Sequence, residues 1–382
     1  MRYCDSIFGQ ILKPIDRRRF ARLVDRHDGD AYDKSFKSWD HLVFLLFAQL
    51  SGVEGLRGLE SVWNANAHRH YHLGVGKVAR TTVSDANLRR PVAIFSETFA
   101  ELSLLASRQL RKEGDAVLRL LDSSPIPLGD LFSWAKWNGR IRGLKLHVVY
   151  DPLTDNPTKI EITDDIEIGE AFPIEAGATY VFDKAYLKFS WWTAISEAGA
   201  TFVTRKKISS RFRATSLRPL RKRKGDGFTV LEDADVKLIS KNVELTVPMR
   251  RVTIRRDEGS KIVLLTNDMQ RSAIEIAGLY KMRWQIELLF RWIKQHLKLK
   301  RFLGRNENAI RLQIIAAMIA YVLLRLAVGA SRLKMPVIRL ADFLTARLFM
   351  RAGIRDIDKP PESHPSKARS RRHIGQMELA IA

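Results

Sequence analysis

The stretch YKMRWQIELLFRWIKQHLK, residues 280–298, combines the pattern of a core helix with an unusual polar edge. Tyr280, Arg283, Glu287 and Lys294 follow one another at helical spacings, and at about 100° per residue such spacings return side chains to one face of a helix. Apolar residues fill the neighbouring stripe, which would anchor the helix in a core. The pattern predicts a buried helix with a phenol, a guanidinium, a carboxylate and an ammonium along one edge.

The chain carries a large excess of positive charge. Its 382 residues include 65 Lys and Arg against 42 Asp and Glu, a formal net charge of +23. Such a surface attracts polyanions, nucleic acid first, because phosphate neutralisation releases counterions. The densest basic stretch, RKKISSRFRATSLRPLRKRK (205–224), contains Phe212 and lies inside a region expected to fold. This placement favours contact with a DNA backbone over a merely solvated face.

Other features exclude several classes of protein. Cys4 is the only cysteine, so neither a disulfide framework nor a cysteine zinc site is expected. The first twenty residues lack the pattern of a signal peptide. The longest apolar run, residues 312–324, is shorter than the ~20 residues that cross a bilayer, so it predicts a buried helix. We expect no membrane partner and a cytoplasmic, nucleoid-associated protein.

The first hundred or so residues predict a helical region. The candidate helices are residues 16–27, 39–50, 55–65 and 81–90. The segment RTTVSDANLRR (80–90) fits a recognition helix in a DNA groove and an ordinary surface helix equally well. His68, His70 and His72 alternate like metal ligands, but no acidic partner is nearby, so we interpret them as a solvated loop or strand.

From about residue 116 onward, the sequence predicts strands. AVLRLLDSSPIPL (116–128) and ATYVFDKAYLKF (178–189) are apolar runs that place Asp122 and Asp183 at predicted strand ends. Strands interleaved with helical segments indicate an α/β domain. Between about residues 206 and 262 strands follow one another without a helix, which predicts a β-rich insertion or an extension of the sheet.

The two aspartates and Glu287 would make an oxygen cage for two Mg²⁺ ions, with Mn²⁺ as a substitute. Two ions ~3.5–4 Å apart can activate a water or a 3′-hydroxyl against a phosphodiester. Arg283 and Lys294 would then clamp phosphates. Acids at strand ends are also common turn formers, so spacing alone leaves the assignment open. Other carboxylates near predicted strands compete: Asp115, Asp130, Asp151, Asp164 and Asp165.

The sequence resembles the DDE transposases of bacterial insertion sequences, of the IS-four type. The resemblance is carried by the YREK signature in residues 280–294, by LLTND before it, by LLDSSPI around the first acid and by VFDKAYLKF around the second. It extends to about residue 345 and includes the N-terminal leader. It implies an RNase H-like catalytic domain in which Asp122, Asp183 and Glu287 bind the metal ions.

The same resemblance implies further roles in DNA binding. Tyr280, Arg283 and Lys294 of the signature would contact DNA near the transposon end. In some relatives a base flips onto a tryptophan during hairpin formation, and Trp284 is similar in position, although plain packing explains it equally well. One departure is Ala185, where relatives commonly have glycine before the tyrosine.

We therefore expect an α/β protein in three parts. These are a helical N-terminal DNA-binding domain (1–110), an RNase H-like catalytic domain (111–345) with a β-rich insertion at about 206–262, and a basic flexible tail (346–382). The expected function is a transposase that binds terminal inverted repeats and performs metal-dependent cleavage and strand transfer, as a homodimer on double-stranded DNA. The alternatives are a catalytically inactive transposase-derived DNA-binding protein and a nuclease without strand transfer.

Overall fold

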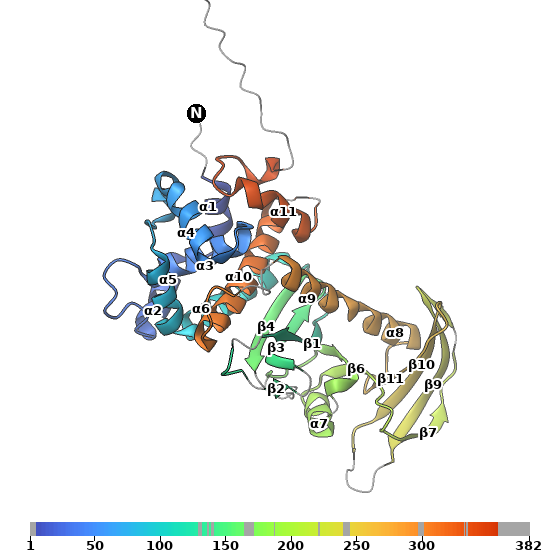
Figure 1. Cartoon of the computed structure of the whole chain (residues 1–382). Coiled ribbons are helices and arrows are strands. Elements are labelled where there is room, and N and C mark those ends of the chain that lie inside the picture. Colours follow the sequence, from blue (N-terminus) through green and yellow to red (C-terminus); the bar gives the residue numbers. More distant parts are fainter. Residues whose placement is uncertain are drawn as a thin grey trace, which may run out of the picture.

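A helical lobe packs beside one long twisted sheet (Figure 1). The computed structural model describes residues 5–128, 132–135, 137–138, 141–163, 172–186, 188–220, 222–239, 245–296, 302–331, 333 and 335–357.

The first half of the sheet is a mixed sheet centred on β1. Its strands are β1 (Leu118–Pro127), β2 (Trp137–Asn138), β3 (Ile141–Asp151), β4 (Asn156–Thr163), β5 (Thr179–Phe182) and β6 (Thr201–Arg205). β1 is antiparallel to β3, which pairs with β4, and parallel to β5, which is parallel to β6. The helix α7 (Phe189–Glu197) connects β5 to β6, because parallel neighbours need a crossover.

The second half continues the same sheet. Its strands are β7 (Phe212–Leu217), β8 (Lys224–Gly225), β9 (Phe228–Leu238), β10 (Met249–Arg256) and β11 (Lys261–Thr266). β11 pairs antiparallel with β6, with Leu264 opposite Arg205, and β10, β9 and β7 follow in order. Of the two interpretations of residues 206–262, the extension of the sheet is therefore confirmed.

The helical lobe surrounds the apolar helix α10 (Glu307–Ser331). The other helices are α1 (Ile7–Leu12), α2 (Arg17–Arg26), α3 (Ser38–Leu50), α4 (Gly55–Ala65), α5 (Arg80–Arg89), α6 (Val92–Leu110) and α11 (Val337–Arg347), with short 3₁₀ turns at Ala67–Arg69, Tyr71–Leu73 and Ile354–Asp356. The four predicted N-terminal helices are confirmed. α6, which the sequence analysis missed, begins directly after Pro91, a residue suited to helix starts.

The helix α10 contains the apolar run that the sequence analysis interpreted as a core helix. It is long and apolar enough to cross a membrane by length and composition, and 78% of its most apolar window is buried within the structure. A helix that is apolar all round is expected inside a core. It packs against α1, α3, α5, α6 and α11 and also against β4, so it joins the helical lobe to the sheet.

The segment after α11 returns to the N-terminus. The amides of Ile7 and Phe8 donate to the carbonyls of Met350 and Leu348 at 2.9 and 2.8 Å, and the Phe349 ring packs on Phe8. The prediction of a flexible tail from residue 346 is therefore wrong for residues 346–357. Residues 358–382 lie outside the described part of the chain.

The predicted helix at 280–298 is divided. α8 (Ala273–Met282) begins at a capping box in which the Ser272 hydroxyl accepts from the Glu275 amide, and α9 (Trp284–His296) follows it. Arg283 lies between them: its amide donates to Tyr280 at 3.1 Å, and its carbonyl accepts from Ile286 at 3.2 Å. This three-residue spacing is that of a tighter 3₁₀-type turn. Residues 297–298 lie outside the described residues.

Candidate active site

Two of the candidate acids lie side by side on neighbouring parallel strands. In the register of β1 and β5, Leu121 is opposite Phe182, and both side chains are buried in the core. The next residue on each chain is the acid, Asp122 on β1 and Asp183 just after β5. The prediction that Asp122 ends its strand is wrong, because β1 continues to Pro127 by pairing with β3, although its pairing with β5 stops at Leu121.

The third acid comes from the helix that packs on β1. Glu287 lies in the first turn of α9, and the buried neighbours Ile286 and Leu289 hold that turn against the core. The Arg283 guanidinium bridges two acids: Nη1 lies 3.1 Å from Oδ2 of Asp122, and Nη2 lies 2.5 Å from Oε1 of Glu287. One cation therefore links carboxylates that come from β1 and from α9.

The site carries more negative than positive charge. Burial raises the pKa of Asp122 to about 6, although the Ser123 amide at 2.8 Å and the Arg283 guanidinium favour its charged form. The nearby charges of Asp183 and Glu287 raise this pKa further. Perturbed carboxyls of this kind are typical of functional sites.

The donor set suits a hard cation, because Asp122, Asp183 and Glu287 supply only carboxylate oxygens. As arranged, the described residues contain no group of three or more His, Cys, Asp or Glu close enough to hold a metal ion. Instead, the Arg283 guanidinium stands as the cation between Asp122 and Glu287. The residues present therefore fit a cation, and a positive side chain occupies the place between two of them.

A tyrosine that the sequence analysis did not single out borders the two aspartates. Tyr186 lies on the 3₁₀ turn after β5, with its amide donating to the Asp183 carbonyl at 3.1 Å. Its buried hydroxyl is hydrogen-bonded to the Ser123 side chain, and burial beside Asp122 and Asp183 raises its pKa. The spacing of three residues after Asp183 was the available signal. Ala185, the departure from the family pattern, lies exposed on this turn.

The signature residues on α8 and α9 occupy different environments. Tyr280 is buried, with the Arg283 guanidinium 5.7 Å from its ring centre; burial raises its pKa, and Arg283 and Asp183 act on it in opposite directions. Lys294 is half-buried, and burial lowers the pKa of its ammonium. Within the described ranges no carboxylate forms an ion pair with Lys294. The structure thus gathers Tyr280 and Arg283 beside the acids.

Trp284 borders a hollow beside the acids. The indole is 51% exposed, with the Arg291 guanidinium 5.5 Å from its ring centre, so packing in the core does not account for it. The hollow has a volume of about 700 Å³ and lies between α8 and the extended half of the sheet. Its lining includes apolar residues such as Phe228 and Ile254 and charged residues of both signs, Asp226, Arg256, Glu258 and Lys281.

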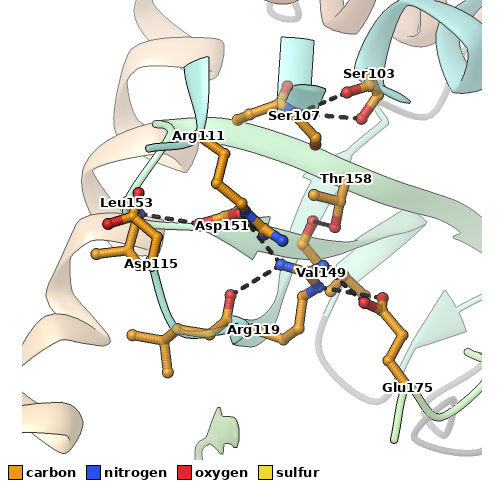
Figure 2. A network of polar contacts seen from close by, with 12 residues as sticks. Ser103, Ser107, Arg111, Asp115, Arg119, Val149, Asp151, Leu153, Thr158 and Glu175 are labelled. Atoms are coloured by element: carbon orange, nitrogen blue, oxygen red, sulfur yellow. Dashed lines mark hydrogen bonds and ion pairs between the residues drawn. The ribbon is translucent and has the colours of Figure 1, made fainter. Parts of the chain in front are cut away.

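The competing acids that the structure describes are structural. Asp151 is wholly buried and lies 2.6 Å from Arg111 and 3.2 Å from Arg119, in the network of Figure 2. Asp115 accepts a hydrogen bond from the Lys112 amide at 2.9 Å, as a turn former does. Asp130, Asp164 and Asp165 lie outside the described residues.

The structure also corrects the interpretations of the basic stretch and of the histidines that were made from the sequence. Phe212, interleaved in the basic stretch, is buried in the core, so it does not present its ring to DNA. Arg218 in that stretch pairs with Asp235 at 2.6 Å, whereas Arg211 and Arg213 are exposed. The interpretation of the histidines as a solvated loop is wrong for His70, which is buried and stacks on Trp63 with ring centres 4.0 Å apart.

Comparisons with known proteins identify the family of this chain. The family model described as Transposase DDE domain matches residues 113–323, more than half of the chain, and a model described as a domain of unknown function matches residues 3–76. A transposase of Sinorhizobium fredii, y4zB, is 54% identical over 303 residues, covering 78% of this chain and 85% of the relative.

A second sequence relative supports the family assignment, whereas a similar solved structure does not. The transposase for insertion sequence element IS5377 of Geobacillus stearothermophilus is 31% identical over 259 residues, 66% of this chain and 68% of the relative. A solved piggyBac transposase synaptic complex with hairpin DNA is 10% identical, with a TM-score of 0.45 over 93% of this chain and 81% of that one, which is too low to carry an argument. The family model and the sequence relatives establish that this chain belongs to the DDE transposases of insertion sequences, polynucleotidyl transferases whose catalytic domain implies an RNase H-like fold.

Proposed function

We propose that this transposase binds the terminal inverted repeats of an insertion sequence, and that it cuts and joins DNA strands at Asp122, Asp183 and Glu287. The observation that carries the proposal is the arrangement of the acids. Asp122 lies on β1, Asp183 directly follows the neighbouring strand β5, and Glu287 comes from α9 and shares Arg283 with Asp122. The pKa of Asp122, which burial raises and the charges of Asp183 and Glu287 raise further, also supports it, because perturbed carboxyls of this kind are typical of functional sites.

Divalent metal ions are the cofactors that DDE transposase domains use, and the three carboxylates would hold two Mg²⁺ or Mn²⁺ ions. When bound, such ions activate a water or a 3′-hydroxyl and stabilise the leaving oxygen of the phosphodiester. The chain's own contribution is to hold three acids from separate elements in one place. The buried neighbours of the acids keep these elements rigid, and Tyr186 fixes the Ser123 side chain beside Asp122.

The signature residues are proposed to hold the DNA strand beside the acids. Arg283 offers a planar fork to a phosphate, and Lys294 offers a half-buried ammonium as a point charge. The buried phenol of Tyr280 would support Arg283 from beneath. Trp284 would stack on an unpaired base at the hollow beside it, since base stacking on an exposed aromatic ring is favourable for any base.

The helical lobe is proposed to recognise the DNA ends. α5 buries Val83 and Asn87 against the lobe and exposes Arg80, Thr81 and Ser84, as a helix that enters a groove does. α2 adds a row of exposed arginines suited to phosphates. The partner would be double-stranded DNA, bound by a homodimer so that two ends are cut together. Bacterial transposases act on DNA in the cytoplasm, and association with the nucleoid is part of this proposal.

The test is cleavage of a supercoiled plasmid that carries the DNA flanking this gene on both sides. Wild type, Glu287→Gln and the control Glu101→Gln, an exposed acid on α6, are compared with Mg²⁺ and with EDTA. We expect breaks and joined ends at the element's borders, dependent on Mg²⁺, lost in Glu287→Gln and retained in Glu101→Gln. End binding without cleavage under any divalent cation would instead favour the inactive DNA-binding protein, and cleavage without joining the simple nuclease.

A further inference from the structure

The position of Arg283 suggests how the site is controlled. We propose that Arg283 is a latch: its guanidinium holds Asp122 and Glu287 until a DNA phosphate takes it over, so that metal binding at the acids is coupled to DNA binding. The inference rests on the proposed function, because it assumes that these acids bind the metal and that Arg283 contacts DNA.

The latch competes directly with a metal ion. Nη1 of Arg283 is 3.1 Å from Oδ2 of Asp122 and Nη2 is 2.5 Å from Oε1 of Glu287, so the guanidinium uses one oxygen of each acid. A divalent ion on the same oxygens would lie beside a fixed positive charge and be repelled by it. Arg283 therefore has to give up at least one acid before both can serve a metal ion.

The latched arrangement leaves the guanidinium incompletely bonded. A guanidinium has five N–H donors, and the buried Nε of Arg283 has no hydrogen-bond partner among the residues that the structure describes. Besides its contact with Tyr280, Arg283 makes two ion pairs, and these go to two different carboxylates rather than to both oxygens of one. A phosphate offers adjacent oxygens that match the guanidinium fork, and it can accept from two of its N–H groups at once. The bonding of Arg283 is thus better satisfied by a phosphate than by the latch.

The chain also provides a route by which a phosphate can reach Arg283. The residue lies at the junction of α8 and α9, where its amide is held by Tyr280 at 3.1 Å, so only its side chain has to move. Arg283 lines the hollow of about 700 Å³ together with Trp284, Arg256 and Lys281. The hollow also contains two acids, Glu258 and Asp226, and Asp226 pairs with Lys281 at 2.5 Å. A strand held at this hollow would bring its backbone within reach of the guanidinium.

The coupling is reciprocal by thermodynamic necessity: DNA that releases the latch strengthens metal binding, and metal strengthens DNA binding by the same factor. This arrangement would keep the acids from binding metal until the substrate is present. It would therefore suppress cutting of unspecific DNA that does not reach Arg283.

The experiment measures Mn²⁺ binding by electron paramagnetic resonance on the full chain without DNA. Arg283→Gln removes the positive charge, and Arg283→Lys keeps the charge but cannot bridge two acids. Arg108→Gln, an exposed arginine on α6, is the matched control. We expect at least tenfold tighter Mn²⁺ binding by Arg283→Gln than by wild type, a smaller gain for Arg283→Lys, and no change for Arg108→Gln. Circular dichroism confirms that each variant is folded.

In a second experiment the Mn²⁺ titration is repeated with a duplex that carries the element's end sequence. The Mn²⁺ bound by the DNA itself is measured with the Glu287→Gln variant and subtracted from the total. Wild type should gain at least tenfold in Mn²⁺ affinity and Arg283→Gln less than threefold. Equal Mn²⁺ affinity of wild type and both Arg283 variants without DNA would overturn the latch but leave the proposed function intact. No Mn²⁺ binding by any variant, with or without DNA, would overturn the proposed function as well.

Discussion

Arg119 and Arg283 each bridge two carboxylates, with opposite consequences. Arg119 on β1 donates from Nη1 to Asp151 at 3.2 Å and from Nη2 and Nε to Glu175 at 2.7 and 3.1 Å (Figure 2). Arg283 donates to one acid on β1 and to one on α9 at the candidate active site. The side chains of both arginines are largely buried, with 7% and 17% exposed.

We call the Arg119 network closed, because each of its two carboxylates contacts two cations. Asp151 is wholly buried, but it also binds Arg111 at 2.6 Å and accepts from the Leu153 amide at 3.0 Å. Glu175 has a further cation within reach, Lys159 at 3.6 Å. Three cations surround the two carboxylates, and the donors of Arg119 are used on both edges of its guanidinium.

We call the Arg283 network open, because one guanidinium serves the carboxylates of both Asp122 and Glu287. A third carboxylate, Asp183, adds to the charge, and the pKa of Asp122 is raised to about 6. Nε of Arg283 lacks a partner among the described residues. The comparison teaches that a network whose carboxylates are outnumbered by cations holds the fold, whereas three carboxylates around one guanidinium indicate a place built for a further ligand.

Breaking the closed network should have the largest effect on stability. Arg119→Met leaves Asp151 wholly buried with one cation fewer, so we expect the free energy of unfolding to fall by about 3–5 kcal/mol. Urea unfolding followed by circular dichroism measures this change.

The matched substitution at the open site is Arg283→Met. Its acids are partly exposed, Asp122 by 19% and Glu287 by 32%, so they can take up protons or cations, and we expect a fall below about 2 kcal/mol. Mg²⁺ at ten times its Kd should return ~1.4 kcal/mol to Arg283→Met and nothing to Arg119→Met. Equal recovery by both variants would remove the distinction between the networks.

Neutralising one aspartate in each network should change stability in opposite directions. In EDTA at pH 7, Asp151→Asn should lower the free energy of unfolding by about 2 kcal/mol or more, because its arginines lose a charged partner. Asp122→Asn should raise it by about 1–3 kcal/mol, because a carboxyl whose pKa is raised to about 6 is charged at a cost. A loss of stability in Asp122→Asn would contradict the open-site interpretation.

The pH dependence has a defined sign. The pKa of Asp122 is raised from its usual 3.8, so between about pH 6 and 4 this carboxyl is more protonated in the folded chain than in the unfolded chain. The cost of charging Asp122 is present above pH 6 and is relieved as the pH falls. Burial lowers the pKa of His41 to about 3 and of His147 to about 4, which destabilises the fold in the same window. The difference between wild type and Asp122→Asn therefore isolates the aspartate: the advantage of the variant should shrink from pH 7 to pH 4.

Local pattern was enough to predict much of the fold, whereas the choice of Asp122, Asp183 and Glu287 among the acids required the resemblance to a known family. Four N-terminal helices and the strands carrying Asp122 and Asp183 have strong periodicity or apolar runs, and such signals depend only on neighbouring residues. The helical spacing of Glu287 and Arg283 likewise predicted that they share a face, and they are in contact.

The features that could not be predicted from the sequence depend on contacts between residues far apart in the chain. Pairing of β11 with β6 joins segments about sixty residues apart, and no local signal distinguishes that pairing from a separate insertion. The contact of Arg283 with Asp122 spans a separation of 161 residues. Asp151 looked like a competing acid until its arginines were located, because its burial and its partners are tertiary properties.

The smallest expected effect is the difference between removing the hydroxyl of Tyr186 and removing that of Tyr180, two buried tyrosines. The Tyr186 hydroxyl is hydrogen-bonded to Ser123 beside the acids, whereas the Tyr180 hydroxyl accepts from the amide of Glu175 at 2.7 Å in the closed network. We expect Tyr186→Phe to slow Mg²⁺-dependent end cleavage about tenfold, which corresponds to about 1.4 kcal/mol, by loosening Ser123 and Asp122. Tyr180→Phe should leave the cleavage rate unchanged and lower the free energy of unfolding by about 1 kcal/mol.

Rates at saturating Mg²⁺ and the Mg²⁺ concentration at half-maximal rate are measured for both variants, together with urea unfolding. A positioning role for Tyr186 predicts that the half-maximal Mg²⁺ concentration rises, since the acid next to Ser123 is held less firmly. A purely structural role would change the unfolding curve but neither kinetic quantity. If both variants slow cleavage equally, the tyrosine beside the acids has no special part, and the boundary between the closed network and the open site has to be drawn elsewhere.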